Sequence, residues 1–550
     1  MVPCLPQKDP DPAGRAAAIS AVRAGYLYTK DYLPPIPMVV NVPSSEAFST
    51  RYLAERTVET SPLLANLLAV KARGIFENLD DLAKYEDLFE SLPLPDIAAS
   101  WRTDWAFAEQ RIAGANPMVI ARVRNAGAIP FTDVHLKPAL GATTVAAEVA
   151  GNRLFVADYS GILAGMDGDK WDKLTKYVPK PVALFAWRKL GFTRNLSGGA
   201  NERGELVPVA IQVEPGKPAS IVTPDQGTAW LLAKIFVQIA DANHHEMSSH
   251  LCRTHFVMAP FGATTARQLS ADHPVFVLLR PHLRFMLYNN DLGRRFLVNQ
   301  GGPVDQLLAG SIDESLQIVT RSYAGWSMAT ASLPDEIADR GVGADVLPHF
   351  PYREDGQRLW EAIDAYVGQY LRLYYATPAD VGADFEIQAW ARELASANDG
   401  NVAGMPAPIN TVDQLQKVLT TVIFTCGPQH SAVNYTQYDS MAFPPNMPLA
   451  AYRPVAIPAD LAGDDAVLPW LPPWGQAADQ LRIMEILTAY HYDRLGHYDE
   501  DFEDPRVAPV LTSFQAGLAR IEADIDASNR YRQLPYTALK PSRVLNSISI

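Results

Sequence analysis

Three histidines recur at every fifth residue in this chain, a spacing that a regular α-helix does not bring together. They lie in the stretch HHEMSSHLCRTH (244–255), as His245, His250 and His255. In an α-helix, residues three or four positions apart share a face, whereas a step of five turns the side chain by about 140°. A π-helical turn, with hydrogen bonds between residues five apart, restores a common face. The spacing therefore predicts a local π-helical turn that gathers imidazoles around a metal ion.

The histidines belong to the second half of a helix that we expect from Thr228 to about Met258. Its first half is apolar around much of its circumference, which is typical of a helix through the centre of a large domain. A zincin site is excluded, because HExxH motifs need histidines four positions apart, whereas His245 and His250 are five apart. Single histidines are usually satisfied by hydrogen bonds, but three at equal spacing on a buried helix favour a metal site.

Further candidate ligands occur near the C-terminus. His430 and Asn434, in CGPQHSAVNYTQYD (426–439), are four positions apart and share a helix face. The last seven residues, VLNSISI, carry no charged side chain. Such a terminus is expected to be buried, where the α-carboxylate of Ile550 requires a cation. Imidazole, amide and carboxylate groups together are the ligands expected of non-haem iron rather than of a closed structural zinc site.

The periodicity of the chain indicates a mainly α-helical protein with one small antiparallel sheet. Strand-like segments occur at 152–160, 182–188 and 205–214, with Gly-rich turns such as SGGANERGE (197–205) between them. Helical patterns then dominate, at 228–258, 275–299, 313–330, 355–376, 411–435, 476–493 and 510–530. The 550 residues contain no Ser/Gly-rich linker, charge block or internal repeat, so one large catalytic unit with an irregular N-terminal arm is expected.

Composition narrows the function further. A net charge of −14 and an isoelectric point near 5.3 argue against a nucleic-acid partner, which requires a basic surface. Cys4, Cys252 and Cys426 form no CxxC pair and indicate no disulfide framework, and Cys252 is expected to be a buried, inert thiol. No signal peptide is visible, and the longest apolar run, WLLAKIFVQIA (230–240), is too short to cross a bilayer. We therefore expect a cytoplasmic protein.

Together these residues resemble the iron-site pattern of the lipoxygenases. That pattern is matched, in order, by His245, His250, His255, His430, Asn434 and the C-terminal Ile550. The flanking stretches WLLAKIFVQIAD, FGATTARQLSADHPVFVLLRPHLRF and FPYREDGQRLWEAI are similar to the same family, and the resemblance covers roughly residues 100–550. It implies a single large helical catalytic domain, built around a long central helix that contains the π-helical turn.

The resemblance also implies a role for each residue of the pattern. The iron ligands are then His250, His255, His430, Asn434 and the carboxylate of Ile550. His245 supports its neighbours without ligating the metal. Glu246 and Gln437 are expected to connect the substrate cavity to the ligands by hydrogen bonds. The expected metal is iron that alternates between its ferrous and ferric states, with manganese as an alternative because its ligand preferences overlap those of iron. No organic cofactor is required.

The N-terminal part departs from the pattern of many lipoxygenases, which begin with a β-sandwich lipid-binding domain. Here we expect a helical and irregular extension at residues 1–100, followed by the catalytic domain at 101–550. Calcium-dependent membrane docking is therefore not expected. The apolar helix LLANLLAV (63–70) suits peripheral contact with a membrane, and packing in the core accounts for it equally well.

The activity implied by the resemblance is dioxygenation of polyunsaturated fatty acids that contain a (Z,Z)-1,4-pentadiene. The metal centre removes a bis-allylic hydrogen, and O₂ adds to the opposite face of the radical to give a chiral hydroperoxide. Two other functions stay open. One is a hydroperoxide isomerase on the same scaffold, which would consume hydroperoxide instead of taking up O₂. The other is a lipid-binding protein with a vestigial metal site, which would purify without iron.

The resemblance further places residues along the substrate channel. Leu297 matches a leucine over its bend, and Ala242, Val304 and Leu307 are expected to line it. Gly293, in NNDLGRRFL (289–297), occupies a position where the family has alanine with S products and glycine with R products. Glycine in a helix is about 1 kcal/mol less favourable than alanine, which invites a functional reason. We therefore predict R hydroperoxides, at carbon 9 of C18 acids and carbon 11 of arachidonate if the methyl end enters first.

Overall fold

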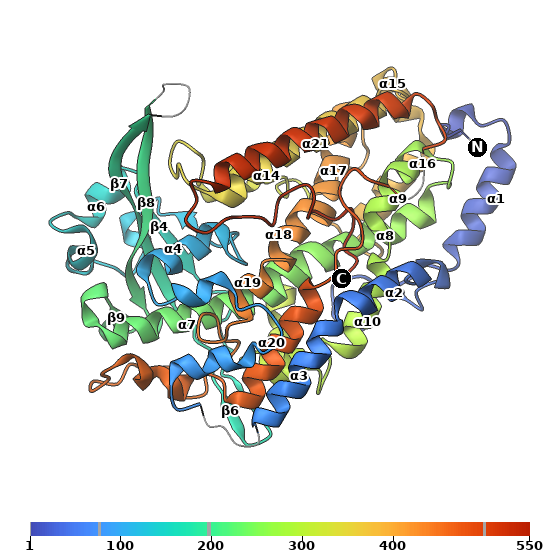
Figure 1. Ribbon diagram of the computed structural model, residues 1–550. Coiled ribbons are helices and arrows are strands. Elements are labelled where there is room, and N and C mark those ends of the chain that lie inside the picture. Colours follow the sequence, from blue (N-terminus) through green and yellow to red (C-terminus); the bar gives the residue numbers. More distant parts are fainter. Residues whose placement is uncertain (1, 75–78, 195–199, 499–501) are drawn as a thin grey trace.

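The computed structural model describes residues 2–74, 79–194, 200–498 and 502–550, and it confirms the mainly α-helical class. Helices form most of the molecule, and a small sheet lies at one end, as Figure 1 shows. Residues from Leu5 to Ile548 contribute to one extensive cluster of buried apolar side chains. The helices that carry the predicted metal ligands lie within this cluster, so the site is built in the interior of the main body.

A continuous helical rod runs through the centre of the molecule. It consists of α7 (Thr228–His244), the π-helix η8 (His245–Phe256) and α8 (Val257–Gln268). Every residue from Trp230 to Asn243 is buried, as its largely apolar circumference predicts. The rod is longer than the expected helix, because α8 continues ten residues beyond Met258, to Gln268. The π-helix is thereby held on both sides by buried helix.

Other helices surround the rod. α17 (Val412–Phe424), the short π-helix η9 (Thr425–Gln429) and α18 (His430–Asn434) follow one another, and α18 packs against η8. α14 (Pro351–Leu371) packs against both α17 and α21 (Val507–Asn529). The remaining helices of this body are α9 (Pro274–Leu283), α10 (Met286–Phe296), α11 (Pro303–Leu307), α12 (Ile312–Ala324), α13 (Leu333–Arg340), α15 (Pro378–Ala383), α16 (Phe385–Ala395), α19 (Gln437–Met441) and α20 (Trp474–Thr488).

The helix expected at 275–299 is divided into α9 and α10. The break lies at Phe285, whose φ of 65° is in the left-handed region that an L-residue seldom adopts inside a helix. Its aromatic ring is buried among Tyr52, Tyr490 and Tyr492, so packing holds this backbone conformation. After this change of direction, α10 packs against η8 and α8.

The predicted strands are confirmed as β4 (Leu154–Asp158), β7 (Val182–Arg194) and β8 (Ala200–Gln212). They form an antiparallel sheet of order β3-β4-β7-β8-β9, with β3 (Ala121–Arg122) and β9 (Ile221–Val222) at its edges. The turn predicted at 197–205 is shorter, because β8 begins at Ala200 and pairs there with Arg194; its residues 197–199 lie outside the described chain. Two helices pack against β8, namely α4 (Asp104–Ala113) and α5 (Asp133–Leu140), and α6 (Val145–Ala150) precedes β4. A separate hairpin consists of β5 (Asp169–Trp171) and β6 (Leu174–Lys176).

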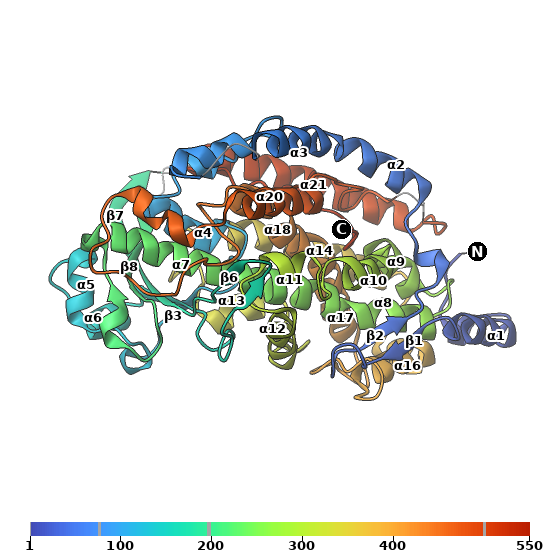
Figure 2. The same ribbon diagram turned by 90° about the horizontal axis from the view of Figure 1, so that it is seen from below.

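The N-terminal arm begins with α1 (Pro12–Arg23) and the hairpin of β1 (Leu27–Thr29) and β2 (Met38–Val40). α2 (Thr50–Glu59) and α3 (Ser61–Gly74) then run along one edge of the molecule in Figure 2, and α3 packs against α20. Core packing accounts for one face of the LLANLLAV helix, where Leu63 is buried, whereas Leu64 and Leu68 on another face are 64% and 65% exposed. No helix of the described residues is long and apolar enough to span a membrane.

Candidate metal centre and substrate cavity

The π-helical turn predicted from the histidine spacing is present, and it brings His250 and His255 together. Their Nε2 atoms lie 3.2 Å apart. His430 joins them from α18, with its ring centroid 5.4 Å from that of His250 and 5.1 Å from that of His255. All three side chains are buried, and one nitrogen of each lies within 4.8 Å of the others. This is a compact group of three imidazoles suited to one metal ion.

The protonation of these rings suits metal binding. Burial, together with the neighbouring His250, lowers the pKa of His255 to about 3. Burial and the two neighbouring imidazoles lower the pKa of His430 well below its usual range. Neutral imidazole is the form of histidine that ligates metals, so no proton has to be displaced from these rings at neutral pH.

A metal ion would also satisfy one buried nitrogen of His430 that otherwise has no partner among the described residues. Both ring nitrogens of His430 are buried without a hydrogen bond among the described residues. An unpaired polar atom in the interior lowers stability, so such an atom in a native protein calls for an explanation. Three neutral nitrogen donors suit iron among the transition metals. The residues of this chain therefore fit the expected metal.

His255 is held in one tautomer by α10. Its Nδ1–H donates to Oδ1 of Asn290 at 2.9 Å, and Asn290 Nδ2 donates to the backbone carbonyl of His255 at 3.2 Å. The lone pair of His255 Nε2 is then directed at the metal group, which is the usual effect of an outer hydrogen bond on a ligating histidine. Sequence reasoning gave Asn290 no role, because its contact with His255 joins two separate helices and leaves no signal in the local sequence.

His245 lies beside the group but turns its Nε2 away from it. That nitrogen lies 2.8 Å from the backbone carbonyl of Val433, to which it donates, and the ring stacks on His250 with centroids 5.7 Å apart. Glu246 lines the cavity, and its Oε2 lies 3.7 Å from Nδ1 of His250, beyond hydrogen-bond distance. His245 therefore connects η8 to α18 at the level of the imidazole group.

Asn434 and Gln437 lie together in the interior. Oδ1 of Asn434 accepts a hydrogen bond from Nε2 of Gln437 at 3.1 Å, and Nδ2 of Asn434 donates to the carbonyl of Leu487 at 2.7 Å. Oε1 of Gln437 has no hydrogen-bond partner among the described residues. Of the expected connection from Glu246 through Gln437, the bond between Gln437 and Asn434 is present. Gln437 makes no hydrogen bond to Glu246 in the described chain.

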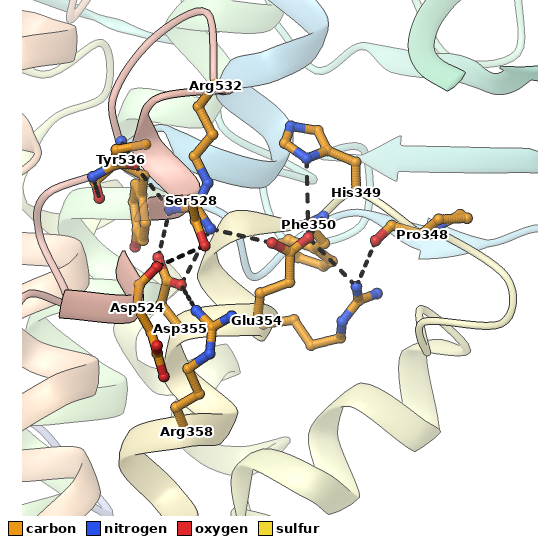
Figure 3. Close-up of polar contacts among 12 residues, drawn as sticks. Pro348, His349, Phe350, Glu354, Asp355, Arg358, Asp524, Ser528, Arg532 and Tyr536 are labelled. Atoms are coloured by element: carbon orange, nitrogen blue, oxygen red, sulfur yellow. Dashed lines mark hydrogen bonds and ion pairs between the residues drawn. The ribbon is translucent and has the colours of Figure 1, made fainter. Parts of the chain in front are cut away.

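The C-terminal segment that follows α21 is tied to α14 before it turns into the core. Figure 3 shows this cluster: the guanidinium of Arg532 donates to both carboxylate oxygens of Asp355, at 2.6 and 3.1 Å, and to Glu354 at 3.1 Å. Asp355 is completely buried. A planar guanidinium bound at two oxygens fixes orientation as well as distance. The position of the C-terminal segment relative to α14 is therefore fixed at Arg532, before the segment enters the core.

The end of this segment passes close to η9 and α18. A Cβ atom on Gly427 would lie 2.8 Å from the carbonyl oxygen of Leu545, so only glycine allows the two backbones to approach here. The amide of Leu545 donates to the hydroxyl of Ser431 at 3.2 Å. Ile550 is 4% exposed and lines the same cavity as His250 and His255. The terminus is therefore buried as predicted from its composition, and its carboxylate stays a predicted ligand.

A cavity of about 270 Å³ adjoins the imidazole group. Its walls come from η8, α10, α11 and α20 and are mainly apolar. Of the predicted channel residues, Gly293, Leu297, Val304 and Leu307 line it, whereas Ala242 is buried in α7 and does not belong to the described lining. A Cβ atom on Gly293 would meet no atom within 4 Å, so this glycine borders open space.

Two cationic side chains reach this apolar cavity, Arg56 from α2 and Arg294 from α10. Arg294 is paired with Asp291 at 2.8 Å. Arg56 has no carboxylate partner among the described residues, and its Nη1 donates to the hydroxyl of Tyr52 at 3.3 Å. Sequence reasoning missed Arg56, because it lies in the N-terminal arm, far from the histidine motifs.

A helical domain with an apolar cavity and three neutral imidazoles beside it defines a metal-dependent enzyme for an apolar substrate. The lipoxygenase family model matches residues 52–537, so its match begins within α2. This chain belongs to the lipoxygenase family. It is an enzyme of that family, whose members depend on non-haem iron.

Known relatives agree with this assignment. The linoleate 9/13-lipoxygenase of Pseudomonas aeruginosa is 34% identical over 494 residues, which cover 86% of this chain and 70% of that protein. A hydroperoxide isomerase of Homo sapiens is 32% identical over 488 residues, or 87% of this chain and 66% of that protein. The crystal structure of a coral 8R-lipoxygenase matches with a TM-score of 0.89 and 29% identity, over 100% of this chain and 83% of that one.

Proposed function

We propose that this lipoxygenase inserts O₂ into polyunsaturated fatty acids with a (Z,Z)-1,4-pentadiene and releases hydroperoxides of R configuration. The observation that carries the proposal is the mainly apolar cavity lined by His250, His255 and Ile550. Burial of a hydrocarbon chain against such walls is favourable, and it places the pentadiene beside the metal group. The cavity walls also exclude water from the reacting carbon atoms.

Iron held by His250, His255 and His430, with Asn434 and the carboxylate of Ile550, would supply the one-electron chemistry that removes a hydrogen atom from the bis-allylic carbon. The chain itself prepares this site in two ways. Burial keeps the imidazoles neutral, and Asn290 fixes the tautomer of His255. Metal analysis of the purified protein distinguishes iron from manganese.

Arg56 is suited to bind the carboxylate of the substrate. Its guanidinium lines the cavity without a carboxylate partner in the described chain, whereas Arg294 is already paired with Asp291. A fatty acid anchored on α2, which lies at the edge of the molecule, would enter with its methyl end first (Figure 2). With oxygenation beside Gly293, this direction gives 9R products from C18 acids and 11R products from arachidonate.

Gly293 supports the R configuration. The open space beside it is where an alanine methyl group would lie, and O₂ is small enough for one methyl group to control its access. The relative with the TM-score of 0.89 is named an 8R-lipoxygenase. Chiral chromatography of the products from linoleate and arachidonate tests the proposal, and products that are mostly S would contradict it.

Variants of the two arginines test the direction of binding. Arg56→Leu is expected to raise KM for the free fatty acid by about tenfold, since a charged hydrogen-bonded pair contributes roughly 1.5–3 kcal/mol. The methyl ester, which has no carboxylate, should show little change. Arg294→Leu is the matched control, because its charge is already neutralised by Asp291. Equal effects of both variants on acid and ester would argue against Arg56 as the anchor.

A hydroperoxide isomerase is the second candidate function. The 32% identity to a human protein of that name shows that this activity occurs among relatives of the chain. Uptake of O₂ with linoleate indicates a dioxygenase, whereas consumption of the hydroperoxide without O₂ uptake indicates an isomerase. A protein that purifies without metal and binds fatty acids would instead be a lipid-binding protein.

We also propose that α2 and α3 make peripheral contact with a lipid surface, the source of an apolar substrate. Leu53, Val58, Leu64 and Leu68 on these helices are between 52% and 68% exposed. Co-sedimentation with phosphatidylcholine vesicles should fall severalfold in a Leu64→Ser/Leu68→Ser variant. Val134→Ser, at a side chain 71% exposed on α5, is the control for lost surface hydrophobicity. Unchanged sedimentation of the double variant would contradict this contact.

A further inference from the structure

Helix α2 reaches the C-terminus of the chain through one buried hydroxyl group. Tyr52 Oη–H donates to the backbone carbonyl of Ser549 at 2.6 Å, and Ser549 is bonded directly to Ile550. Among the described residues, no hydrogen bond from another helix or strand lies closer to the terminus. We infer that Tyr52 is a positioning residue, which orients the Ile550 carboxylate toward the metal. This inference rests on the proposed function, in which that carboxylate is a ligand.

The geometry of the peptide bond makes this contact effective. The carbonyl oxygen of Ser549 and the Cα atom of Ile550 belong to the same planar peptide unit, which resists rotation. A hydrogen bond that holds this oxygen therefore also holds the Cα atom from which the terminal carboxylate projects. Only the φ and ψ angles of Ile550 are left to orient the carboxylate. A single planar peptide unit thus separates the contact made by Tyr52 from the residue that carries the predicted ligand.

The rest of the terminus does not provide an equivalent support. The amide of Asn546 donates to Asp493 at 3.0 Å, four residues before the end of the chain. Beyond it, Ser549 makes a local bond from its amide to the carbonyl of Ser547 at 3.0 Å. A local bond moves with the segment and cannot locate it relative to the histidines. Tyr52 supplies that external reference, because its helix α2 is also held by the hydrogen bond from Tyr490 to Glu55 at 2.7 Å.

The ring of Tyr52 is itself fixed by a cluster of aromatic side chains. Phe48 stacks on it with centroids 4.1 Å apart, while Phe285 and Tyr490 meet it edge-on at 5.3 and 5.1 Å. The side chain is fully buried, and burial raises the pKa of the Tyr52 hydroxyl, so it stays protonated as a donor at neutral pH. A phenylalanine at this position would retain the packing and lose only the hydrogen bonds of the hydroxyl, to Ser549 and from Arg56.

The same hydroxyl also connects the terminus to the substrate cavity. Arg56, one turn further along α2, donates to the oxygen of Tyr52 at 3.3 Å and lines the cavity. One helix therefore provides both the proposed carboxylate anchor and the support of the predicted metal ligand. This explains why a helix from the N-terminal arm is part of the site.

The test compares two phenylalanine variants of the iron-loaded protein. Tyr52→Phe removes the bond to Ser549 together with the bond from Arg56, and Arg56→Leu, which removes only the second, separates the two effects. Tyr490→Phe is the matched control, since its hydroxyl belongs to the same aromatic cluster and binds Glu55 of α2 at 2.7 Å, not the terminus. We expect Tyr52→Phe to lose iron to a chelator about tenfold faster than the wild type, the usual scale for an outer contact to a ligand. Its ferric electron paramagnetic resonance spectrum should also change, and Tyr490→Phe should match the wild type in both measurements.

Three results would contradict either the role of Tyr52 or the proposed function. Wild-type retention and spectrum in Tyr52→Phe would overturn the inference while leaving the proposed function intact. Equal changes in Tyr52→Phe and Tyr490→Phe would also overturn it, because they would indicate general loosening of α2. A wild-type protein that binds neither iron nor manganese would instead refute the proposed function. Thermal unfolding of both variants shows whether the fold is retained at the temperature of the iron measurements.

Discussion

His250 Nε2 and His255 Nε2 lie 3.2 Å apart in the interior, although the two residues are five positions apart in the chain. The Nδ1–H of His255 is used by Asn290, so its Nε2 carries a lone pair. Neutral imidazoles do not gain by turning lone pairs toward a common point unless a proton or a cation lies there. His430 lies at the same point, and its ring nitrogens have no hydrogen-bond partner in the described part of the chain, so a metal ion is the species that the arrangement suits.

Substitution of each histidine of the triplet by alanine should distinguish the metal ligands from the supporting histidine by the iron content of the variants. His250→Ala and His255→Ala are expected to abolish iron binding, since each removes one of the donors gathered at the site. His245→Ala should retain a larger share of the iron, because its Nε2 is directed to the carbonyl of Val433. Metal content per protein, measured by mass spectrometry of the elements, checks this. Equal losses in all three variants would contradict this division between ligands and a supporting histidine.

Extension of the C-terminus should remove iron and activity together. A residue added after Ile550 converts its carboxylate into a neutral amide, and Ile550 lies in a buried position beside the histidines. Deletion of Ile550 is expected to have the same effect. A tag of equal length at the N-terminus is the control. Full iron occupancy in the extended protein would rule out the carboxylate as a ligand.

Gly293→Ala should change the product without loss of folding. A Cβ atom at this position meets no atom within 4 Å, and alanine is more favourable than glycine inside a helix by about 1 kcal/mol. The added methyl group is expected to obstruct O₂ and to shift oxygenation toward the opposite end of the pentadiene and toward S. A tenfold change in product ratio needs a barrier difference of only about 1.4 kcal/mol. An unchanged profile on chiral chromatography would exclude oxygen-access control by this residue.

Arg532→Ala should be strongly destabilising, because it leaves the carboxylate of Asp355 buried without its bidentate partner. Removal of one member of a buried ion pair typically costs about 3–5 kcal/mol. Arg358→Ala is the matched control: Arg358 also binds Asp355, at 2.8 Å, but is 35% exposed, so a loss of about 1 kcal/mol or less is expected. Urea unfolding of both variants measures the difference, and equal midpoints would contradict the anchoring role of Arg532.

His349 should make stability depend on pH. Burial opposes its protonation, but the hydrogen bond and the charge of Glu109, at 2.9 Å, prevail and raise the pKa of His349. A raised pKa in the folded state gives a stabilisation that is complete below the unfolded value of about 6.5 and is lost as the pH rises through the folded value. The unfolding midpoint of His349→Gln should therefore lie below that of the wild type at about pH 6, with a smaller gap at about pH 9. A gap that widens with pH would reverse this sign.

Local spacing was sufficient to predict the π-helical turn, because the geometry of a helix converts the distance between residues in the chain directly into a direction in space. The same reasoning located the long buried helix, the strands of the sheet and a buried C-terminus, each from the composition of a continuous stretch. It did not predict the break at Phe285, since the left-handed conformation there is held by tyrosines from α2 and from residues 490–492.

The contacts that complete the site were decided by the tertiary structure alone. Asn290 binds His255 across 35 residues, and Tyr52 binds Ser549 across 497. Gly427 is required only because the carbonyl of Leu545 passes 2.8 Å from the position of its missing side chain. Periodicity carries information about which face of an element is buried, but not about which distant element covers that face. That choice depends on the packing of the whole core, where many residues must fit together at once.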